Sequence, residues 1–349
     1  MIKNNTNSKE ISSGKRFVYA FITMLIAVLL ALLCAELFFR ATGRFVPTAY
    51  KKSAIPGLGF EMKNGFVFDN GENTIRFNSE GFRDAEFTVK KMKNSLRVVC
   101  LGDSMTAGVA LPLDALYLNV LEQMFDATEQ KVEFQNMAVG GYNTAQQWLV
   151  YEHKAKKYNP DLIMVQFLMN DLTYSYPVYQ GESSIGKLKA FLGDHLRLYN
   201  FLSFLKRGIK ANQTTELINI DPQTAPISLE FFNAIFDPTA PYFNQWTSQI
   251  KKFGELNRSG TPTLFVIFPW PIYAGMDEGK AYPYYCIHNQ VKDALRKEGL
   301  NYVDVTPELM SRGNIRQFWV SSDDFHLNAE AHRIIAEVLF RELRSSLAD

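Results

Sequence analysis

The feature that most constrains the fold is a regular alternation between short apolar runs and longer segments with helical periodicity. The apolar runs are residues 96–101, 132–136, 162–167, 263–268 and 302–305, and the helical patterns are 114–126, 143–158, 243–257, 286–298 and 328–345. Parallel strands that are buried on both faces appear as continuous apolar runs, and they need crossover helices. The alternation therefore predicts an α/β domain with a parallel sheet of about five strands, covered by helices on both faces.

Small and polar residues follow the first three apolar runs directly. Ser104 lies in CLGDSMT after the first run, Gly141 in NMAVGGYNT after the second, and Asn170 in FLMND after the third. Taken singly, each has an ordinary explanation: a helix N-cap for Ser104 and Asn170, and a turn for Gly141. Functional residues of parallel sheets gather at the carboxyl ends of the strands, so we expect the three to lie close together.

A serine hydroxyl becomes a useful nucleophile only when a base takes its proton. Of the five histidines, His326 lies in SSDDFHLNAEAH, just before the last helical pattern, with Asp323 three residues earlier. A carboxylate at this spacing can orient the imidazole by a hydrogen bond. The alternatives are a surface histidine, or a metal site with His332. The metal site is disfavoured because the HExxH spacing and a third ligand are missing.

The four segments, in this order, resemble the four blocks of the SGNH, or GDSL-like, hydrolase superfamily. The resemblance covers roughly residues 75–345. It implies a flavodoxin-like three-layer α/β/α fold. It also implies a catalytic triad of Ser104, His326 and Asp323, and an oxyanion hole formed by Ser104, Gly141 and the Asn170 amide.

The resemblance implies a serine esterase or deacylase that hydrolyses a lipid or cell-envelope glycan ester through an acyl-enzyme. Two alternatives stay open: an O-acyltransferase with the same triad, and an inactive envelope scaffold or binding protein. No P-loop or dinucleotide motif is present, so we expect neither a cofactor nor a metal. The formal net charge of +1 gives no reason to expect a nucleic-acid partner, whereas an envelope protein partner is possible.

Three positions depart from the family pattern or extend it. Leu168 occupies the usual glycine position of the third block and is expected to narrow the substrate site. The fourth block has adjacent aspartates; the D-x-x-H spacing favours Asp323 and leaves Asp324 as the alternative. Residues 76–84, RFNSEGFRD, resemble a membrane-anchored bacterial branch of the family.

The N-terminal run FVYAFITMLIAVLLALLCA, Phe17–Ala35, carries no charge. Its length of about 19 residues is close to what a bilayer core requires. No A-x-A-like cleavage site follows it, and Leu33 before Cys34 argues against a lipoprotein. A buried core helix would need a polar face. The sequence therefore predicts a single-pass signal anchor at 17–39 with a cytoplasmic tail at 1–16. Basic residues flank both ends equally, and the short basic head places the catalytic domain outside the cytoplasm.

Turn signals and short alternating strands predict a tether and a small β element at 40–95, before a hydrolase-like domain at 96–349 with an insert at about 172–260. Within the insert, LRLYNFLSFLKRGIK, 196–210, is interpreted first as a helix packed on the domain, and alternatively as a lid or an interfacial membrane helix. Aromatic residues in 269–273 are candidates for the substrate cleft or for simple packing. Cys34, Cys100 and Cys286 are expected to be isolated, buried thiols, and a Cys100–Cys286 disulfide is the alternative.

Overall fold

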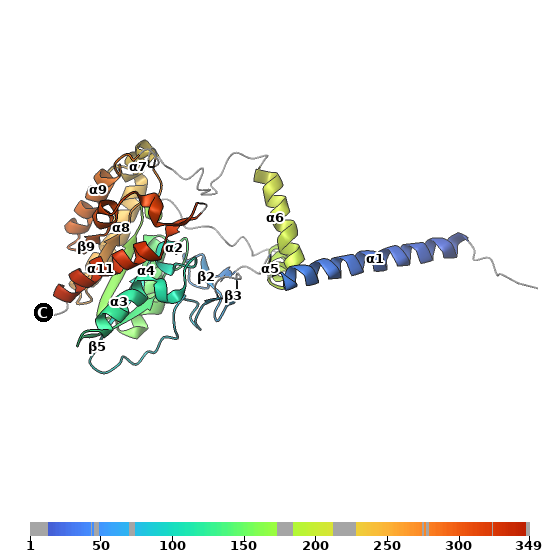
Figure 1. Ribbon diagram of the computed structural model, residues 1–349, viewed down its shortest axis with the longest axis horizontal. Coiled ribbons are helices and arrows are strands. Elements are labelled where there is room, and N and C mark those ends of the chain that lie inside the picture. Colours follow the sequence, from blue (N-terminus) through green and yellow to red (C-terminus); the bar gives the residue numbers. More distant parts are fainter. Residues whose placement is uncertain are drawn as a thin grey trace, which may run out of the picture. The chain divides into compact units, whose positions relative to one another are not determined.

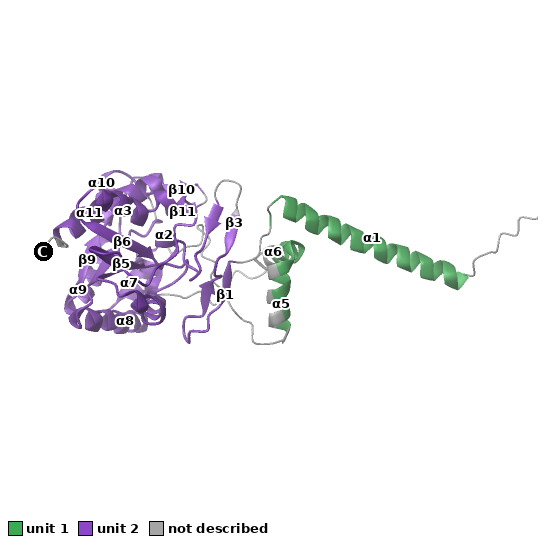
Figure 2. Ribbon diagram, turned by 90° about the horizontal axis from the view of Figure 1, so that it is seen from below, with its two compact units in different colours: residues 1–48, 181–215 green, residues 49–180, 216–349 purple. Residues whose placement is uncertain are grey.

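The computed structural model describes residues 13–42, 44, 49–69, 74–172, 184–211, 228–273, 276, 279–322 and 324–346. The chain divides into two compact units (Figure 2). One unit comprises residues 1–48 and 181–215, and the other comprises residues 49–180 and 216–349. We call these the N-terminal unit and the sheet unit, and we describe each by itself.

The sheet unit is built on a five-stranded parallel sheet with the strand order β6-β5-β7-β8-β9. The strands are β5 Ser95–Leu101, β6 Lys131–Asn136, β7 Leu162–Phe167, β8 Thr263–Ile267 and β9 Asn301–Asp304. This confirms the predicted parallel α/β sheet. The first strand of the chain order, β5, lies between β6 and β7, with Val99 opposite both Gln135 and Ile163. Successive crossovers therefore diverge at the carboxyl end of β5, the usual position of a site in such sheets.

Helices cover both faces of the sheet. Figure 2 shows α3 (Tyr117–Asp126) and α11 (Ala329–Ser346) on one side of the strands, and α7 (Leu229–Phe236) and α8 (Pro241–Arg258) on the other. The same unit contains α4 Thr144–Val150, α9 Tyr285–Lys297 and α10 Thr306–Ser311. Each predicted helical pattern corresponds to one of these helices.

The helical pattern at 143–158 is not one continuous α-helix. After α4 the chain widens into a π turn at Tyr151–Ala155, tightens into a 3-10 turn at Lys156–Tyr158, and ends at Asn159 with φ 49°. Asparagine tolerates this left-handed conformation better than most residues. The change of helix type explains why apolar periodicity alone overstated the length of the α-helix.

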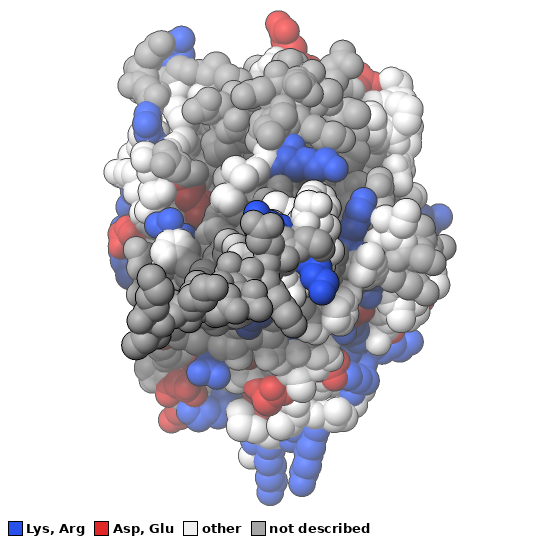
Figure 3. Space-filling model, turned by 90° about the vertical axis from the view of Figure 1, so that its right-hand side faces the viewer, with Lys and Arg blue, Asp and Glu red and all other residues white. Residues whose placement is uncertain are grey.

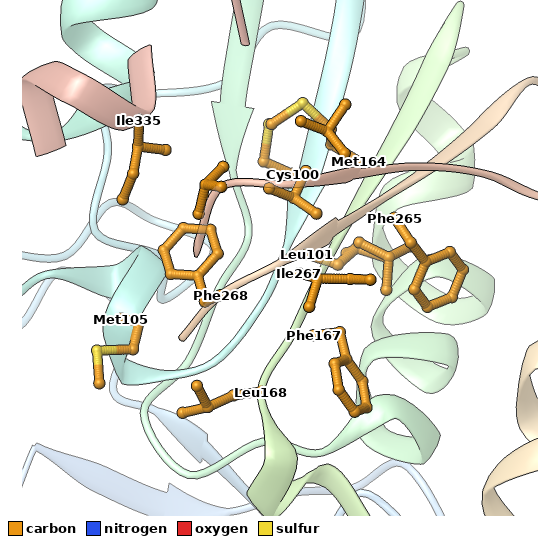
Figure 4. Packing of buried hydrophobic residues seen from close by; sticks show 14 of the residues in the cluster. Cys100, Leu101, Met105, Met164, Phe167, Leu168, Phe265, Ile267, Phe268 and Ile335 are labelled. Carbon is orange, nitrogen blue, oxygen red and sulfur yellow. The ribbon is translucent and has the colours of Figure 1, made fainter. Parts of the chain in front are cut away.

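The core lies between the strands and the two helical layers. Figure 4 shows Leu101, Met164 and Phe265 of three adjacent strands, and Ile335 of α11 on the side of Phe268. On the other side of β8, the Phe265 ring meets Phe253 of α8 edge-on, with ring centroids 5.6 Å apart. Among the described residues no disulfide is formed, and Cys34, Cys100 and Cys286 are free thiols as expected. Cys100 is buried, whereas Cys34 and Cys286 are exposed, so the expected burial is wrong for these two.

Residues 49–95 form two antiparallel hairpins in the sheet unit. Strand β1 (Tyr50–Lys52) pairs with β2 (Phe60–Met62), and β3 (Val67–Asp69) pairs with β4 (Thr74–Arg76). The Tyr142 hydroxyl donates to the Phe60 carbonyl at 2.5 Å, and the Gln146 amide donates to the Leu58 carbonyl at 2.8 Å. These bonds fix the first hairpin beside the start of α4.

The N-terminal unit contains α1 (Ser13–Ala41), α5 (Ser184–His195) and α6 (Arg197–Ala211). Among the described residues, α1 is the one helix long and apolar enough to cross a membrane, with a mean hydropathy of 2.8 and none of its apolar window buried. A signal sequence would meet the same criteria. The segment 196–210 is helical, and its described contacts include α1 (Figure 1).

In Figure 3, basic and acidic side chains are interspersed among uncharged ones on the face shown.

Candidate active site

Ser104 is the first residue of the short helix α2 (Ser104–Ala107), which begins two residues after β5 ends. Asp103 caps this helix, because its carboxylate accepts the Met105 N–H at 2.8 Å. Gly102 is required, since a Cβ there would lie 2.7 Å from Gln166 Oε1. Gly-Asp therefore makes the turn, and Ser104 stands at its tip.

The Ser104 hydroxyl lies at one end of a hydrogen-bonded chain. Its Oγ is 2.9 Å from Nε2 of His326, and Nδ1 of the same ring is 2.5 Å from Oδ1 of Asp324. The Asp324 carboxylate also accepts the His326 backbone N–H at 3.0 Å. Both residues belong to β11 (Asp324–Leu327), which pairs with β10 (Trp319–Ser321). The spacing-favoured Asp323 lies outside the described residues, so its role stays a prediction.

The electrostatics of this chain suit proton transfer. Burial acts to lower the pKa of His326. The hydrogen bond and charge of Asp324 act in the opposite direction, as does the charge of Asp103, and overall the pKa is raised. The hydrogen bond to His326 lowers the pKa of Asp324. An ionised Asp324 that accepts from Nδ1–H leaves the Nε2 lone pair directed at the serine proton.

Gly141 and Asn170 line the same cavity as Ser104 and His326. Gly141 has φ +82° in a turn that closes with a 3.1 Å bond from Tyr142 N–H to the Val139 carbonyl, a position that favours glycine. Asn170 lies in a 3-10 turn (Met169–Leu172) after β7. Its side chain hydrogen-bonds the Asp103 carboxylate. The structure thus brings the predicted site residues of the first three blocks together with His326; the oxyanion roles stay predictions.

The cavity beside Ser104 has a volume of about 580 Å³ and mostly apolar walls. Leu168, at the position where the family pattern has glycine, is one of its lining residues, and Trp270 from the aromatic segment 269–273 is another. The hairpin region supplies a further wall, formed by Tyr50, Phe60, Met62 and Phe77. Sequence reasoning did not assign this wall, because the strands that carry it are only three residues long.

Arg83 and Asp84 of the RFNSEGFRD segment bind the backbone of two segments next to the site. The buried Arg83 guanidinium donates to the carbonyl oxygens of Ala107 (3.1 Å), Gly108 and Leu111, at the end of α2. The Asp84 carboxylate accepts the Asn136 N–H at 2.7 Å, at the end of β6. The sequence singled this segment out by resemblance, but gave no signal for these distant contacts.

Two other histidines have structural surroundings. His332 is buried in α11, where Nδ1 accepts the Tyr117 N–H at 3.0 Å; burial lowers its pKa to about 3, so the ring is neutral. His288 lies 3.1 Å from Asp304 and 3.2 Å from the Tyr282 hydroxyl. The same hydroxyl accepts the Trp270 N–H at 2.7 Å and so supports the cavity wall. The described residues contain no cluster of three or more His, Cys, Asp or Glu side chains suited to a metal ion.

Comparisons with known proteins give one matching family model and several similar solved structures. A family model described as the GDSL-like lipase/acylhydrolase family matches residues 100–334. No curated protein sequence matches the chain. The similar solved structures include TesA, with 13% identity and a TM-score of 0.43 over 71% of this chain and 98% of that one. A lipase/acylhydrolase from Enterococcus faecalis has 12% identity and a TM-score of 0.43, over 72% and 96%. The acetylxylan esterase Axe2 from Geobacillus stearothermophilus, in a mutant form, has 11% identity and a TM-score of 0.44, over 72% and 96%.

Proposed function

The chain belongs to the GDSL-like lipase/acylhydrolase family of ester-hydrolysing enzymes, and on that premise we propose that it is a membrane-anchored serine esterase or deacylase with Ser104 as its nucleophile. The observation that carries the proposal is the hydrogen-bonded chain from Asp324 through His326 to the Ser104 hydroxyl. An N-cap serine needs no such base, because it acts by accepting a backbone N–H.

The proposed reaction has two steps. His326 Nε2 takes the Ser104 proton while Oγ attacks the ester carbonyl, and the oxyanion is received by backbone N–H groups of Ser104 and Gly141 and by the Asn170 amide. The protonated His326 then gives its proton to the leaving alcohol, which leaves an acyl-enzyme. Water, deprotonated by the same ring, attacks the acyl carbon. The acid then leaves as the bond to Ser104 Oγ breaks, and the protonated His326 returns its proton to that oxygen.

The apolar lining of the cavity supports an ester with an apolar group, within the proposed class of lipid or envelope glycan esters. If a sugar hydroxyl took the place of water, the same steps would transfer the acyl group, and the chain would act as an O-acyltransferase. The acceptor that resolves the acyl-enzyme distinguishes the two activities.

The proposed location is the membrane, with α1 as a single-pass signal anchor and the sheet unit outside the cytoplasm, where an envelope protein partner is within reach. The support is the length and hydropathy of α1, together with the exposure of its apolar side chains. Protease digestion tests the orientation. The sheet unit should be cleaved in cells whose outer layer alone has been made permeable, without disruption of the membrane that α1 spans.

A fluorophosphonate probe tests the nucleophile. We expect the full-length protein to be labelled at Ser104, as located by mass spectrometry, and both Ser104→Ala and His326→Ala to abolish labelling. Ser228→Ala is the matched control, because Ser228 caps α7 through a 3.4 Å bond to the Phe231 N–H and has no catalytic position. Labelling at another serine, or none in a folded protein, would refute the assignment.

A further inference from the structure

Helices α5 and α6 expose large apolar side chains that a soluble surface would normally cover. Ile185, Leu188 and Phe191 of α5 are 65%, 56% and 57% exposed. Leu202 and Leu205 of α6 are 53% and 43% exposed. We call these five residues the α5–α6 apolar face. Their spacing of three along each helix places them on one side of it.

The start of α6 is attached to the C-terminal end of α1 by charged and aromatic contacts. The Glu36 carboxylate accepts the backbone N–H groups of Arg197 at 3.2 Å and Leu198 at 2.8 Å. The Arg197 guanidinium donates to the Phe39 carbonyl at 3.0 Å, and the rings of Phe39 and Phe201 have centroids 5.0 Å apart. Since a carboxylate satisfies the open N–H groups at a helix start, α6 begins at the level of Glu36.

That level coincides with the end of the uncharged run of α1. From Phe17 to Ala35 the helix rises about 28 Å at ~1.5 Å per residue, close to the thickness of a bilayer core of about 30 Å. Glu36 and Arg40, which form a 2.7 Å ion pair, are the first charges after this run. In Figure 1, α6 runs across the axis of α1, so a membrane that α1 spans has α6 lying along its boundary.

The charge of the segment fits the same boundary. By sequence, residues 184–211 contain six basic residues and one acidic residue, which gives a net charge of +5. Amphipathic helices with basic residues bind in the plane of anionic membranes, with apolar side chains below the headgroups and basic ones among them.

We propose that the α5–α6 apolar face is a second membrane contact, seated in the interface of an anionic lipid surface beside the anchor. The proposal rests on the proposed membrane insertion of α1 and is independent of the esterase chemistry. Lipid is the proposed occupant for two reasons. Helix α6 contacts α1, and the basic charge of residues 184–211 is complementary to anionic headgroups.

Site-specific fluorescence in reconstituted vesicles tests the contact with the full chain. The background variant is Cys34→Ala with Cys286→Ser, which removes the two exposed thiols, whereas Cys100 is buried and stays unlabelled. In this background, Leu202→Cys or Leu205→Cys is labelled with an environment-sensitive dye. Ser203→Cys, at a half-buried polar residue between the two leucines in the sequence, is the control. A protein that keeps Cys34 reports whether α1 is inserted. The vesicles contain phosphatidylglycerol or only phosphatidylcholine, with quenchers attached near the headgroup or deep in the acyl chains.

We expect the headgroup-attached quencher to quench the dye at positions 202 and 205 at least twofold more strongly than the dye at position 203. This difference should decrease in vesicles that contain only phosphatidylcholine. The dye on Cys34 should respond to the deep quencher. If Cys34 is quenched while 202, 203 and 205 remain equally accessible to water, the lipid contact is wrong but the anchor stands. If 202 and 205 are shielded from water without lipid quenching, a protein surface covers the face and the proposal is overturned. If Cys34 is not quenched, the anchor and the second contact both fail, whereas fluorophosphonate labelling of Ser104 still reports on the esterase.

Discussion

Among single residues, the two adjacent carboxylates before His326 have the clearest consequences for activity. Asp324 lies against Nδ1 of His326 in the structure, whereas the D-x-x-H spacing of the family favours Asp323. The two aspartates are adjacent in the sequence DDFH. The two assignments therefore need variants of each aspartate, measured side by side.

We expect Asp324→Asn to lower kcat on the order of a thousandfold or more, because the amide no longer fixes the useful tautomer. The pH profile should change as well. The pKa of His326 lies above its ordinary value of 6.5 because the bond and charge of Asp324 outweigh burial. The ring must be neutral to act as a base, so activity falls as the pH drops below that pKa. In Asp324→Asn the carboxylate charge is absent, so the pKa of His326 falls. The acid limb of the pH profile of kcat/KM therefore moves to lower pH.

Asp323→Asn is the matched comparison and should leave the acid limb where it is. If Asp323→Asn instead causes both the loss of kcat and the shift, Asp323 is the working orienter, as the family spacing favours. Steady-state hydrolysis of a soluble chromogenic ester between pH 5 and 9 distinguishes these results.

A second residue-scale prediction concerns Asn170. Removing one oxyanion donor should lower kcat on the order of a hundredfold or more with little change in KM, so Asn170→Ala should be folded and slow. Asn143→Ala is the control: Asn143 caps α4 by accepting the Gln146 N–H at 3.1 Å, so its loss should affect stability and spare turnover. The free energy of that cap is about 1 kcal/mol. Full turnover in Asn170→Ala would remove Asn170 from the oxyanion hole.

The sequence identified Ser104, Gly141, Asn170 and His326 because their blocks have the right order and follow predicted strands. It did not reveal Arg83 or Asp84, whose partners lie 24 to 52 residues further along the chain. Such roles depend on tertiary contacts, which a local pattern does not contain.

At the level of elements, the short helix α2 depends on a neighbour outside the block that contains the nucleophile. A four-residue helix has little stability of its own, and the Arg83 guanidinium replaces water at its last carbonyl groups. This support holds the serine in position without touching it. Arg83 is thus a positioning residue.

We expect Arg83→Met to reduce the free energy of unfolding by about 1.5–3 kcal/mol, the usual contribution of hydrogen bonds to a charged group. It should also lower kcat more than it raises KM, because the serine loses its fixed direction. Arg76→Met, an exposed arginine of the same segment, should change stability by less than ~0.5 kcal/mol. Denaturant titration and steady-state kinetics on both variants provide the test; equal behaviour would contradict a positioning role.

Leu168, in the turn after β7, is expected to limit the space that the cavity offers to the acyl group of the substrate. Leu168→Ala should admit bulkier esters, which raises kcat/KM for a branched acyl group relative to acetyl, at a stability cost of about 2–5 kcal/mol. Leu162→Ala, a buried change in β7 at a residue that does not line the cavity, should cost similar stability and keep the wild-type preference. Kinetics with a series of acyl esters separate the two; an unchanged preference in Leu168→Ala would show that this side chain does not limit the substrate.

The five strands of the parallel sheet were predictable to within about one residue, because continuous apolar runs in such a sheet leave little choice of element. The association of α5 and α6 with α1 was not predictable. It depends on Glu36 meeting the backbone of Arg197 and Leu198, 161 and 162 residues away. The sequence gave amphipathicity but no partner.

For the molecule as a whole, stability should depend on the half-buried carboxyl groups of Glu122 and Asp84. Burial raises the pKa of Glu122 to about 7, and the charge of Asp84 adds to the shift. The pKa of Asp84 is likewise raised by burial, to about 6. Because the folded chain retains protons that the unfolded chain has released, these groups make stability fall as the pH rises from about 4 to 7.

Glu122→Gln should therefore raise the melting temperature at pH 8 and change it little at pH 4.5, since glutamine carries no charge to bury. The Phe134 N–H, which bonds the Glu122 side chain, keeps an oxygen acceptor in this variant. Glu129→Gln, at an exposed glutamate, should leave the pH dependence of the melting temperature unchanged. A gain in Glu122→Gln that is equal at both pH values would show that the effect is not one of titration.

The separation of 222 positions along the chain between Ser104 and His326 also has a consequence during synthesis. The nucleophile leaves the ribosome early, whereas its base belongs to β11 and becomes available only when the last part of the chain has been made. A nascent or truncated chain therefore carries an inert serine, and hydrolytic activity begins only with the finished protein. In the proposed mechanism, a stop codon after Ala107 and before residue 326 would yield a product that retains the Ser104 turn but has no base to activate it.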